Sequence, residues 1–468
     1  MRPFSGSLVA VALLGAAMAA TQSTTYDVVL AGGRVIDPDS GLDAVRHVGI
    51  TGGTVSAVST APLQGRTTIN AAGLVVAPGF VDLHQHDHSP DAYELKAADG
   101  VTTAFELEVG VGDIDAWYAD RRGKATINYG ASIGHIPVRM KVLDDPGDFL
   151  PSGAAAQREA TEAEIEQINA RIRRGLERGA AGVGFGIAYT PQATRVEILE
   201  VFAEAGRRGA PAFVHMRGGD PIAATQEVVA SAVATGTPLH IVHVQSTGGR
   251  QTGNVLRLVA MARERGVDVT TEMYPYTASA TRIESALYDN WQQFPDTRFQ
   301  NFLWPATGER LTRELFAKYR AIGGTVISFG NTEEVVSLAV AHPLTIIASD
   351  GSIVHPRGSG TYARVLGRYV REQKALTLMD ALRKMTIMPA KRLEKVIPAM
   401  QRKGRIAVGA DADITVFDPA RVIDVATFEK PATASAGIQH VLVAGTFVVR
   451  DGVPQLAMPG QAMRGPIR

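Results

Sequence analysis

The chain has 468 residues, of which 45% are hydrophobic and 20% charged, a composition typical of a folded globular protein. Its 47 basic and 47 acidic residues cancel, which argues against a nucleic-acid partner or an anionic membrane surface. The chain contains no cysteine, so disulfides, thiolate metal ligands and lipid attachment at a cysteine are excluded. This length accommodates a barrel-sized domain together with a smaller one.

The first residues are similar to a secretory signal. Arg2 supplies a positive start, residues 8–17 form an apolar run, and Ala17-Met18-Ala19 fits the small-x-small cleavage rule. An uncleaved membrane anchor is the alternative, but the apolar run is short for a bilayer span of roughly 20 residues. We therefore expect residues 1–19 to be removed, leaving a periplasmic or secreted protein with no membrane attachment.

Both ends of the remaining chain are expected to contain short β-strands. In residues 20–77, apolar runs are separated by turn signals such as Gly32-Gly33 and Gly52-Gly53. The same pattern of short apolar runs and turns recurs in residues 401–468. The two ends are expected to pair into one small β-sandwich, which is discontinuous because a larger domain lies between them.

The middle of the chain, residues 78–400, alternates strand and helix patterns. The strand before His84 is followed by seven more candidates, at residues 101–107, 126–133, 181–187, 212–215, 239–244, 267–272 and 344–349. Repeated β-then-α units favour a parallel sheet, and eight strands close a (β/α)8 barrel. The fold class is therefore predicted as α/β, a TIM barrel with the small terminal β domain. Residues 281–324 form a long connection that is predicted as a lid-like insertion. An extra helical hairpin with its own small core is the plainer interpretation, and the two are compatible.

Histidines cluster where the first barrel strand is expected to end. Side chains alternate along a strand, so His84 and His86 share one face, with Asp82 in line behind them and His88 one step further. Two imidazoles placed in this way can hold one divalent metal. A histidine-rich surface loop is the competing interpretation of this segment alone.

The other strand ends carry similar side chains, and catalytic groups in such barrels collect at this rim. The residues concerned are Glu106 and Glu108, His135, His215 with Arg217, His243, Tyr274 with Tyr276, and Asp350. Each alone has a structural explanation, such as a hydrogen-bonded core histidine or a helix cap. Together they predict a metal site of imidazoles and carboxylates, which suits zinc, manganese or iron and is large enough for two ions.

The chain resembles the amidohydrolase superfamily and, within it, the D-aminoacylase group. The resemblance rests on segments that run in the family's order through nearly the whole chain. They are Pro78 to His86, Gly100-Val101-Thr102-Thr103, His215-Met216-Arg217, Tyr274-Pro275-Tyr276, Ser349-Asp350-Gly351, His355-Pro356-Arg357, Arg364 to Val370, Arg383 to Thr386, Gly404-Arg405-Ile406 and Gly409 to Asp413.

The resemblance implies roles for individual residues. His84 and His86, with Asp350, would hold the more buried of one or two divalent ions, zinc being the first expectation, and His215 and His243 the other. Asp350 would also be the general acid/base, carrying a proton from water to the leaving nitrogen. Tyr274 would donate to the carbonyl oxygen, and Arg357 would bind the substrate carboxylate. Further substrate contacts are predicted at Tyr276, His135 and Arg217.

Three departures from the family pattern concern the site. The family's bridging cysteine is absent, and the fourth strand lacks the lysine that other members carboxylate. Glu108 is the nearest replacement bridge and Glu106 the second, although an ungapped count from Gly100 places Val109 opposite the cysteine. Gln245 stands where many relatives carry lysine, and Ala280 where some carry a polar substrate contact.

The sequence thus predicts a metal-dependent hydrolase of an amide bond in a small molecule, most directly an N-acyl-D-amino-acid deacylase or a hydrolase of small peptides. A cyclic-amide hydrolase or a deaminase is the alternative within the superfamily, and neither would need Arg357. A non-catalytic binding protein on the same fold is the alternative of another class. The sequence leaves open whether the chain forms a homo-oligomer.

Overall fold

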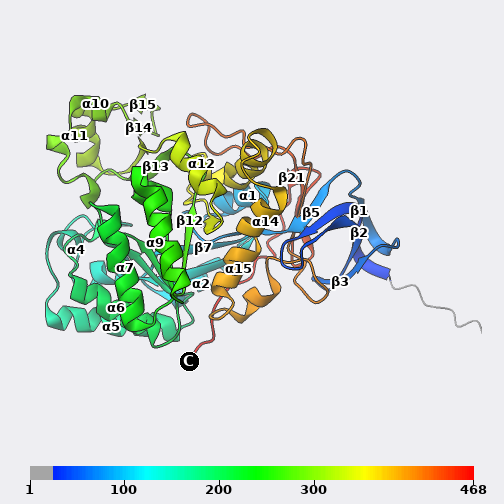
Figure 1. The fold of residues 1–468 in the computed structure, drawn as a ribbon, viewed down its shortest axis with the longest axis horizontal. Coiled ribbons are helices and arrows are strands. Elements are labelled where there is room, and N and C mark those ends of the chain that lie inside the picture. The colour runs from blue at the N-terminus through cyan, green and yellow to red at the C-terminus, as the bar shows by residue number, and fades with distance from the viewer. Residues whose placement is uncertain (1–24) are drawn as a thin grey trace, which may run out of the picture.

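The computed structural model describes residues 25–468, so the expected signal segment lies outside the described residues. Eight parallel strands form the central sheet in the order β17-β12-β11-β10-β9-β8-β7-β6 (Figure 1). Their bounds are β6 Phe80–Asp82, β7 Val101–Val111, β8 Asn128–Gly134, β9 Val183–Gly186, β10 Ala212–His215, β11 Leu239–Ile241, β12 Val269–Met273 and β17 Thr345–Ile347. The predicted α/β barrel is confirmed.

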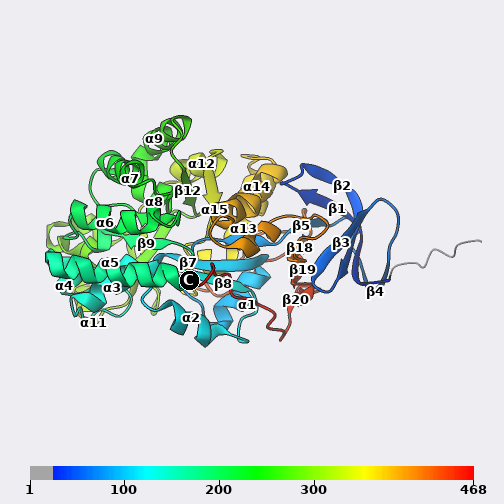
Figure 2. The ribbon, with the colours of Figure 1, turned by 90° about the horizontal axis from the view of Figure 1, so that it is seen from below.

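Helices lie between successive strands or follow the last one, and they cover the outside of the sheet (Figures 1 and 2). They are α1 Pro90–Ala98, α2 Ile114–Arg121, α3 His135–Val142, α5 Glu162–Glu177, α6 Arg195–Gly206, α7 Pro221–Thr235, α8 Val244–Gly248, α9 Thr252–Glu264, α12 Glu333–Ala341, α13 Arg357–Arg364, α14 Leu378–Met385 and α15 Ile387–Leu393. None of the helices between residues 25 and 468 is long and apolar enough to cross a bilayer.

A buried polar contact joins the first strand to the last. The Asp82 carboxylate at the end of β6 accepts hydrogen bonds from Ser349 Oγ at 2.6 Å and from Lys96 Nζ on α1 at 2.8 Å. Beyond it, the His86 N–H donates to the Gly351 carbonyl at 2.9 Å and the Gly351 N–H donates to the His84 carbonyl at 3.3 Å. These bonds close the barrel and bring the segments that carry His84 and Asp350 together.

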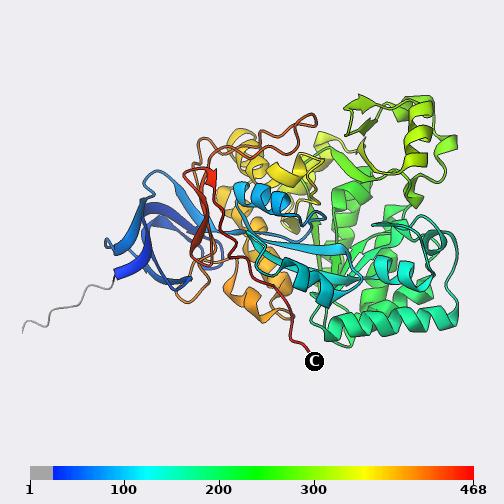
Figure 3. The same cartoon turned by 180° about the vertical axis from the view of Figure 1, so that it is seen from behind.

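Strands from both ends of the chain form one nine-stranded sheet beside the barrel (Figure 3). They are β1 Thr25–Asp37, β2 Leu42–Thr51, β3 Thr54–Ser59, β4 Gln64–Asn70 and β5 Val75–Pro78, with β18 Ile414–Phe417, β19 Ile438–Val443, β20 Thr446–Arg450 and β21 Val453–Pro454. The two sets meet where β5 pairs antiparallel with β18. Apolar side chains from both ends, including Val35, Val48 and Ile414, form a core that is separate from the barrel's.

The connection after β12 forms a small antiparallel unit on one side of the barrel (Figure 1). Its strands are β13 Ala278–Arg282, β14 Phe302–Trp304, β15 Glu309–Arg310 and β16 Thr325–Phe329, and its helices are α10 Asp296–Phe299 and α11 Arg313–Ile322. Phe299, Phe302 and Phe316 are buried in a core of its own. The unit has its own core, as one interpretation of the sequence expected. It is built around a four-stranded sheet, however, and not around the helical hairpin of that interpretation.

Candidate metal centre

The Glu108 carboxylate lies between two pairs of imidazoles. It comes from β7 and is 2% exposed. Its Oε2 is 2.7 Å from His84 Nε2 and 3.2 Å from His86 Nε2. Its Oε1 is 2.6 Å from His215 Nδ1 and 3.6 Å from His243 Nε2. One oxygen therefore faces each pair, which is the arrangement that a carboxylate bridging two cations requires.

Two groups of potential metal ligands share this glutamate. His84, His86, Glu108 and Asp350 form one group, and Glu108, His215 and His243 form the other, with the ligand atoms of each within 4.8 Å of one another. All come from the carboxyl ends of strands or the loops that follow. Neutral imidazoles and carboxylates are the donors that borderline divalent ions such as zinc accept. The residues present therefore fit a two-ion site.

Alternation along β7 places Glu108, rather than Val109, on the face that carries the ligand cluster, together with Glu106. The pairing of β7 with β8 is regular to Glu106 and then shifts before Val111, and Gly110 takes a positive φ of 67°. Val109 packs into an apolar cluster with Ile136. Val109 therefore faces away from the ligand cluster, as the alternation of side chains along a strand requires.

Two further carboxylates hold the first pair of imidazoles from behind. Glu106 Oε2 is 2.9 Å from His86 Nδ1, and Glu272 Oε1 on β12 is 2.5 Å from His84 Nδ1. An imidazole that donates Nδ1–H to a carboxylate keeps its Nε2 lone pair for a cation. Glu272 is not among the site residues predicted from the sequence. Its only signal was an acid inside an otherwise apolar and threonine-rich strand.

The charge balance of this cluster favours a bound cation. Burial lowers the pKa of His84, but the carboxylates of Asp350, Glu272 and Glu108 outweigh it and raise that pKa to about 10. Burial lowers the pKa of His215 in spite of its contact with Glu108.

Two of the candidate ligands also have strained backbones, with φ of 30° at His243 and 49° at Asp350. Such strain in non-glycine residues concentrates at functional sites.

Asp350 and Arg357 form a buried pair beside the imidazoles. Arg357 Nη2 is 2.8 Å from Asp350 Oδ1. Burial would raise the pKa of Asp350, but the charges of Arg357 and His84 lower it below its usual value, so this carboxylate is ionised at neutral pH. Among the described residues, Nε and Nη1 of Arg357 have no hydrogen-bond partner, although the side chain is only 1% exposed. A buried guanidinium with unsatisfied donors is suited to receive an anionic group.

Tyr274 presents a second unsatisfied donor. Its hydroxyl has no hydrogen-bond partner within residues 25–468, and burial raises its pKa to about 12, so the hydroxyl keeps its proton. The Arg357 guanidinium lies 4.5 Å from the centre of its ring. Gln245 donates to the Tyr274 carbonyl at 3.1 Å and is buried.

A cavity of about 90 Å³ opens beside the imidazoles and the Asp350–Arg357 pair. His86, Glu108, His243, Asp350 and Arg357 line its polar side, and Val109, Phe149, Leu150, Tyr189 and Ala280 line the rest with Thr281, Arg282, Thr325 and Ser352. Ala280, Thr281 and Arg282 belong to β13, so the small antiparallel unit supplies one wall of the cavity.

The remaining candidate residues are engaged by other partners. His135 Nε2 is 2.8 Å from Glu197 Oε1 in a fully buried contact. Arg217 pairs with Glu227 at 2.8 Å, and the Tyr276 hydroxyl donates to Asp424 at 3.2 Å. His88 contacts the Tyr93 hydroxyl and the Gln85 carbonyl. The structure therefore does not bring His135, Tyr276 or His88 into the ligand cluster, and the Arg217 guanidinium points to a partner on α7. A substrate contact at His135, Tyr276 or Arg217 stays a prediction.

The Glu272 contact generates a prediction about metal affinity. Replacing Glu272 by Gln removes the charge that fixes the His84 tautomer, so we expect metal affinity to fall by about 10- to 100-fold. Competition with a chelating dye measures this affinity. Glu334→Gln, at an exposed site on α12, is the matched control. An affinity within twofold of wild type, with an unchanged melting temperature, would show that Glu272 does not orient His84.

Comparison with known proteins supports this interpretation of the site. An N-acyl-D-glutamate deacylase of Alcaligenes xylosoxydans xylosoxydans is 32% identical over 94% of this chain and 96% of its own, and a D-aminoacylase of the same organism is 30% identical over 93% and 96%. The crystal structure of N-acyl-D-glutamate deacylase from Bordetella bronchiseptica, complexed with zinc and a phosphonate inhibitor, has a TM-score of 0.81 at 28% identity, covering 94% of this chain and 100% of that one. The model of the amidohydrolase family matches residues 75–448. The chain therefore belongs to the amidohydrolase family and is a hydrolase of amide carbon–nitrogen bonds.

Proposed function

We propose that the enzyme removes the acyl group from N-acyl-D-amino acids. Relatives named for this reaction align with almost the whole chain. The observation that carries the proposal is the buried Arg357 guanidinium, which lies beside Asp350 with two nitrogens unsatisfied. An N-acyl amino acid has its carboxylate next to the scissile amide, and a planar guanidinium binds a carboxylate through two parallel hydrogen bonds.

The proton transfers are assigned to Asp350. Its ionised carboxylate faces the same space as the Nε2 atoms of His84 and His86, which lie 3.6 and 3.4 Å away. A bound divalent cation would lower the pKa of water and polarise the amide carbonyl. Asp350 accepts the proton from the attacking water and delivers it to the leaving nitrogen, which keeps the amine from departing as an anion.

Tyr274 and the apolar wall are assigned to orientation. The unpartnered Tyr274 hydroxyl is a preorganised donor for the oxygen that gains negative charge in the transition state. Phe149 and Leu150 give the cavity an apolar side. Arg282, the other cation of the lining, is paired with Glu284 at 2.8 Å. We therefore propose a preference for neutral amino-acid side chains.

Zinc is the proposed metal, with two ions joined by Glu108. Replacing Glu108 by Ala removes the carboxylate that faces both imidazole pairs, so we expect metal content to fall from two ions per chain to one or none. Metal analysis of the purified proteins measures this. Glu94→Ala, on α1, is the matched control, and full metal content and activity in Glu108→Ala would refute the bridge.

The role of Arg357 is tested with paired substrates. Losing a charge-assisted contact should raise the KM of Arg357→Gln for N-acetyl-D-leucine by about 10- to 100-fold. The matching N-acetyl-D-leucine amide, which has no carboxylate, should be affected much less. Arg282→Gln, in the same cavity, is the control. An equal loss on both substrates would mean that Arg357 acts only through Asp350.

Export is a separate part of the proposal. The segment that ends at Ala19 supports cleavage by a signal peptidase, so the mature protein would begin near Ala20 in the periplasm or outside the cell. Fractionation of a Gram-negative host followed by N-terminal sequencing tests this. Full-length protein recovered from the cytoplasm would contradict it.

A further inference from the structure

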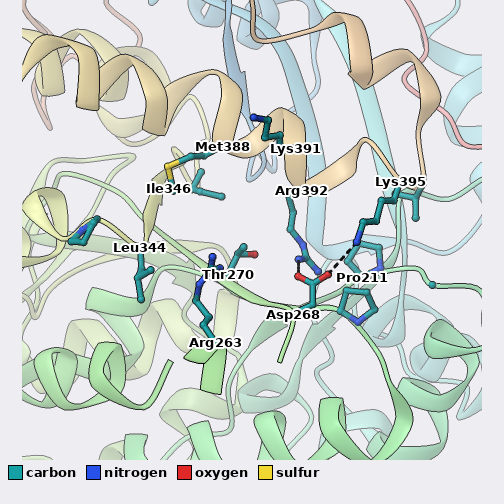
Figure 4. Close-up of a pocket in the computed structure, with 14 residues that line it drawn as sticks. Pro211, Arg263, Asp268, Thr270, Leu344, Ile346, Met388, Lys391, Arg392 and Lys395 are labelled. Carbon is teal, nitrogen blue, oxygen red and sulfur yellow. Dashed lines mark hydrogen bonds and ion pairs between the residues drawn. The ribbon is translucent and has the colours of Figure 1, made fainter. Parts of the chain in front are cut away.

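A second pocket lies at the end of the barrel opposite the metal centre. Its volume is about 320 Å³, and its lining includes Pro211, Pro238, Asp268 and Leu344, each of which comes just before a barrel strand. The candidate metal ligands instead follow the carboxyl ends of strands. Helix α15 and the turn after it cover the pocket, as Figure 4 shows.

The most unusual group in this pocket is the Arg392 guanidinium. The Arg392 side chain is 4% exposed, and its Nη1 is 2.6 Å from Asp268 Oδ1. Within residues 25–468, its Nε and Nη2 have no hydrogen-bond partner. Leaving donors of a buried cation unsatisfied is costly, so a solvent molecule or an anion is required to complete them.

Two further cations extend the positive charge around Arg392. Lys395 Nζ is 4.0 Å from Asp268 Oδ2 and its side chain is 84% exposed, so it is available to a ligand. Arg263 is held on the other side by a hydrogen bond to the Val269 carbonyl. Lys391 also lines the pocket but pairs with Asp39 at 2.8 Å. Asp268 is the only carboxylate in the described lining, so positive charge exceeds negative charge there.

The remaining wall is apolar. Leu344, Ile346 and Met388 lie on the side of the pocket away from Lys395 (Figure 4). A ligand that contacts both the cationic side and the apolar side of the pocket would carry a compact negative group and a short apolar part. The volume of the pocket accommodates a molecule of that size.

We propose that this pocket binds a small organic anion, with its carboxylate or phosphate group on Arg392, Lys395 and Arg263 and its apolar part against Met388 and Ile346. The site is separate from the metal centre, so its occupancy would not compete with substrate. It rests on residues that the proposed deacylase reaction does not use.

Direct location of the anion is the first experiment. Crystals of the metal-loaded enzyme are soaked in para-bromobenzoate or in selenate, and the anomalous scattering of bromine or selenium locates each probe. We expect density for at least one probe within hydrogen-bond distance of Arg392 Nε or Nη2, the donors that Asp268 does not occupy. Bromobenzoate alone would identify a carboxylate ligand, and selenate alone a tetrahedral anion of the phosphate kind. The absence of both from this pocket would overturn the proposal.

Binding in solution is the second experiment. Calorimetry at constant ionic strength compares wild type with Arg392→Gln and Lys395→Ala. Loss of a charge-assisted contact should lower the binding affinity for the probe by about tenfold or more in Arg392→Gln. Lys395→Ala changes an exposed side chain, so it tests the site even if Arg392→Gln does not fold. Lys318→Ala, an exposed change on α11, is the control. Equal affinity in wild type and Lys395→Ala would contradict the proposal, whatever the deacylase assays show.

Discussion

The organisation of the site depends on one carboxylate buried among four imidazoles. Glu108 has one oxygen toward His84 and His86 and the other toward His215 and His243. A buried carboxylate is costly unless positive charge surrounds it. Bound divalent cations would supply that charge and leave the imidazoles neutral. The same carboxylate therefore lies between both ligand groups and belongs to each of them.

A second buried carboxylate holds the rim in register. Asp82 binds Lys96 on α1 and Ser349 after β17, so it connects the first strand of the barrel to the last. Its own backbone leads directly to His84, and Ser349 leads directly to Asp350. A buried ion pair contributes little net stability, because desolvation offsets its attraction, but it can fix a unique arrangement. Here it fixes the position of His84 and His86 relative to Asp350, the proposed acid/base.

The barrel and most of the ligand cluster could be predicted, because strand periodicity and strand-end histidines are local signals. His84, His86, His215, His243 and Asp350 all meet at one rim. The bulge at Gly110 could not be predicted, since it depends on how β7 packs against β8. His135, a strand-end histidine like the others, faces Glu197 instead of the cavity. Spacing along a strand therefore indicates which residues reach the rim but not which partner each one meets there.

The electrostatics of the cavity limit the substrates of the proposed reaction. An acidic amino-acid side chain would need a cation in addition to the one that binds the α-carboxylate. Arg357 is assigned to that carboxylate, and Arg282 is already paired with Glu284. Gln245 is buried, carries no charge and uses its Nε2 on the Tyr274 carbonyl. Desolvating a second carboxylate against Phe149 and Leu150 would be unfavourable, whereas an apolar side chain would gain contact with both. Both guanidinium groups that line the cavity are thus committed, and neither is left for an acidic side chain. The proposed preference for neutral side chains follows from this.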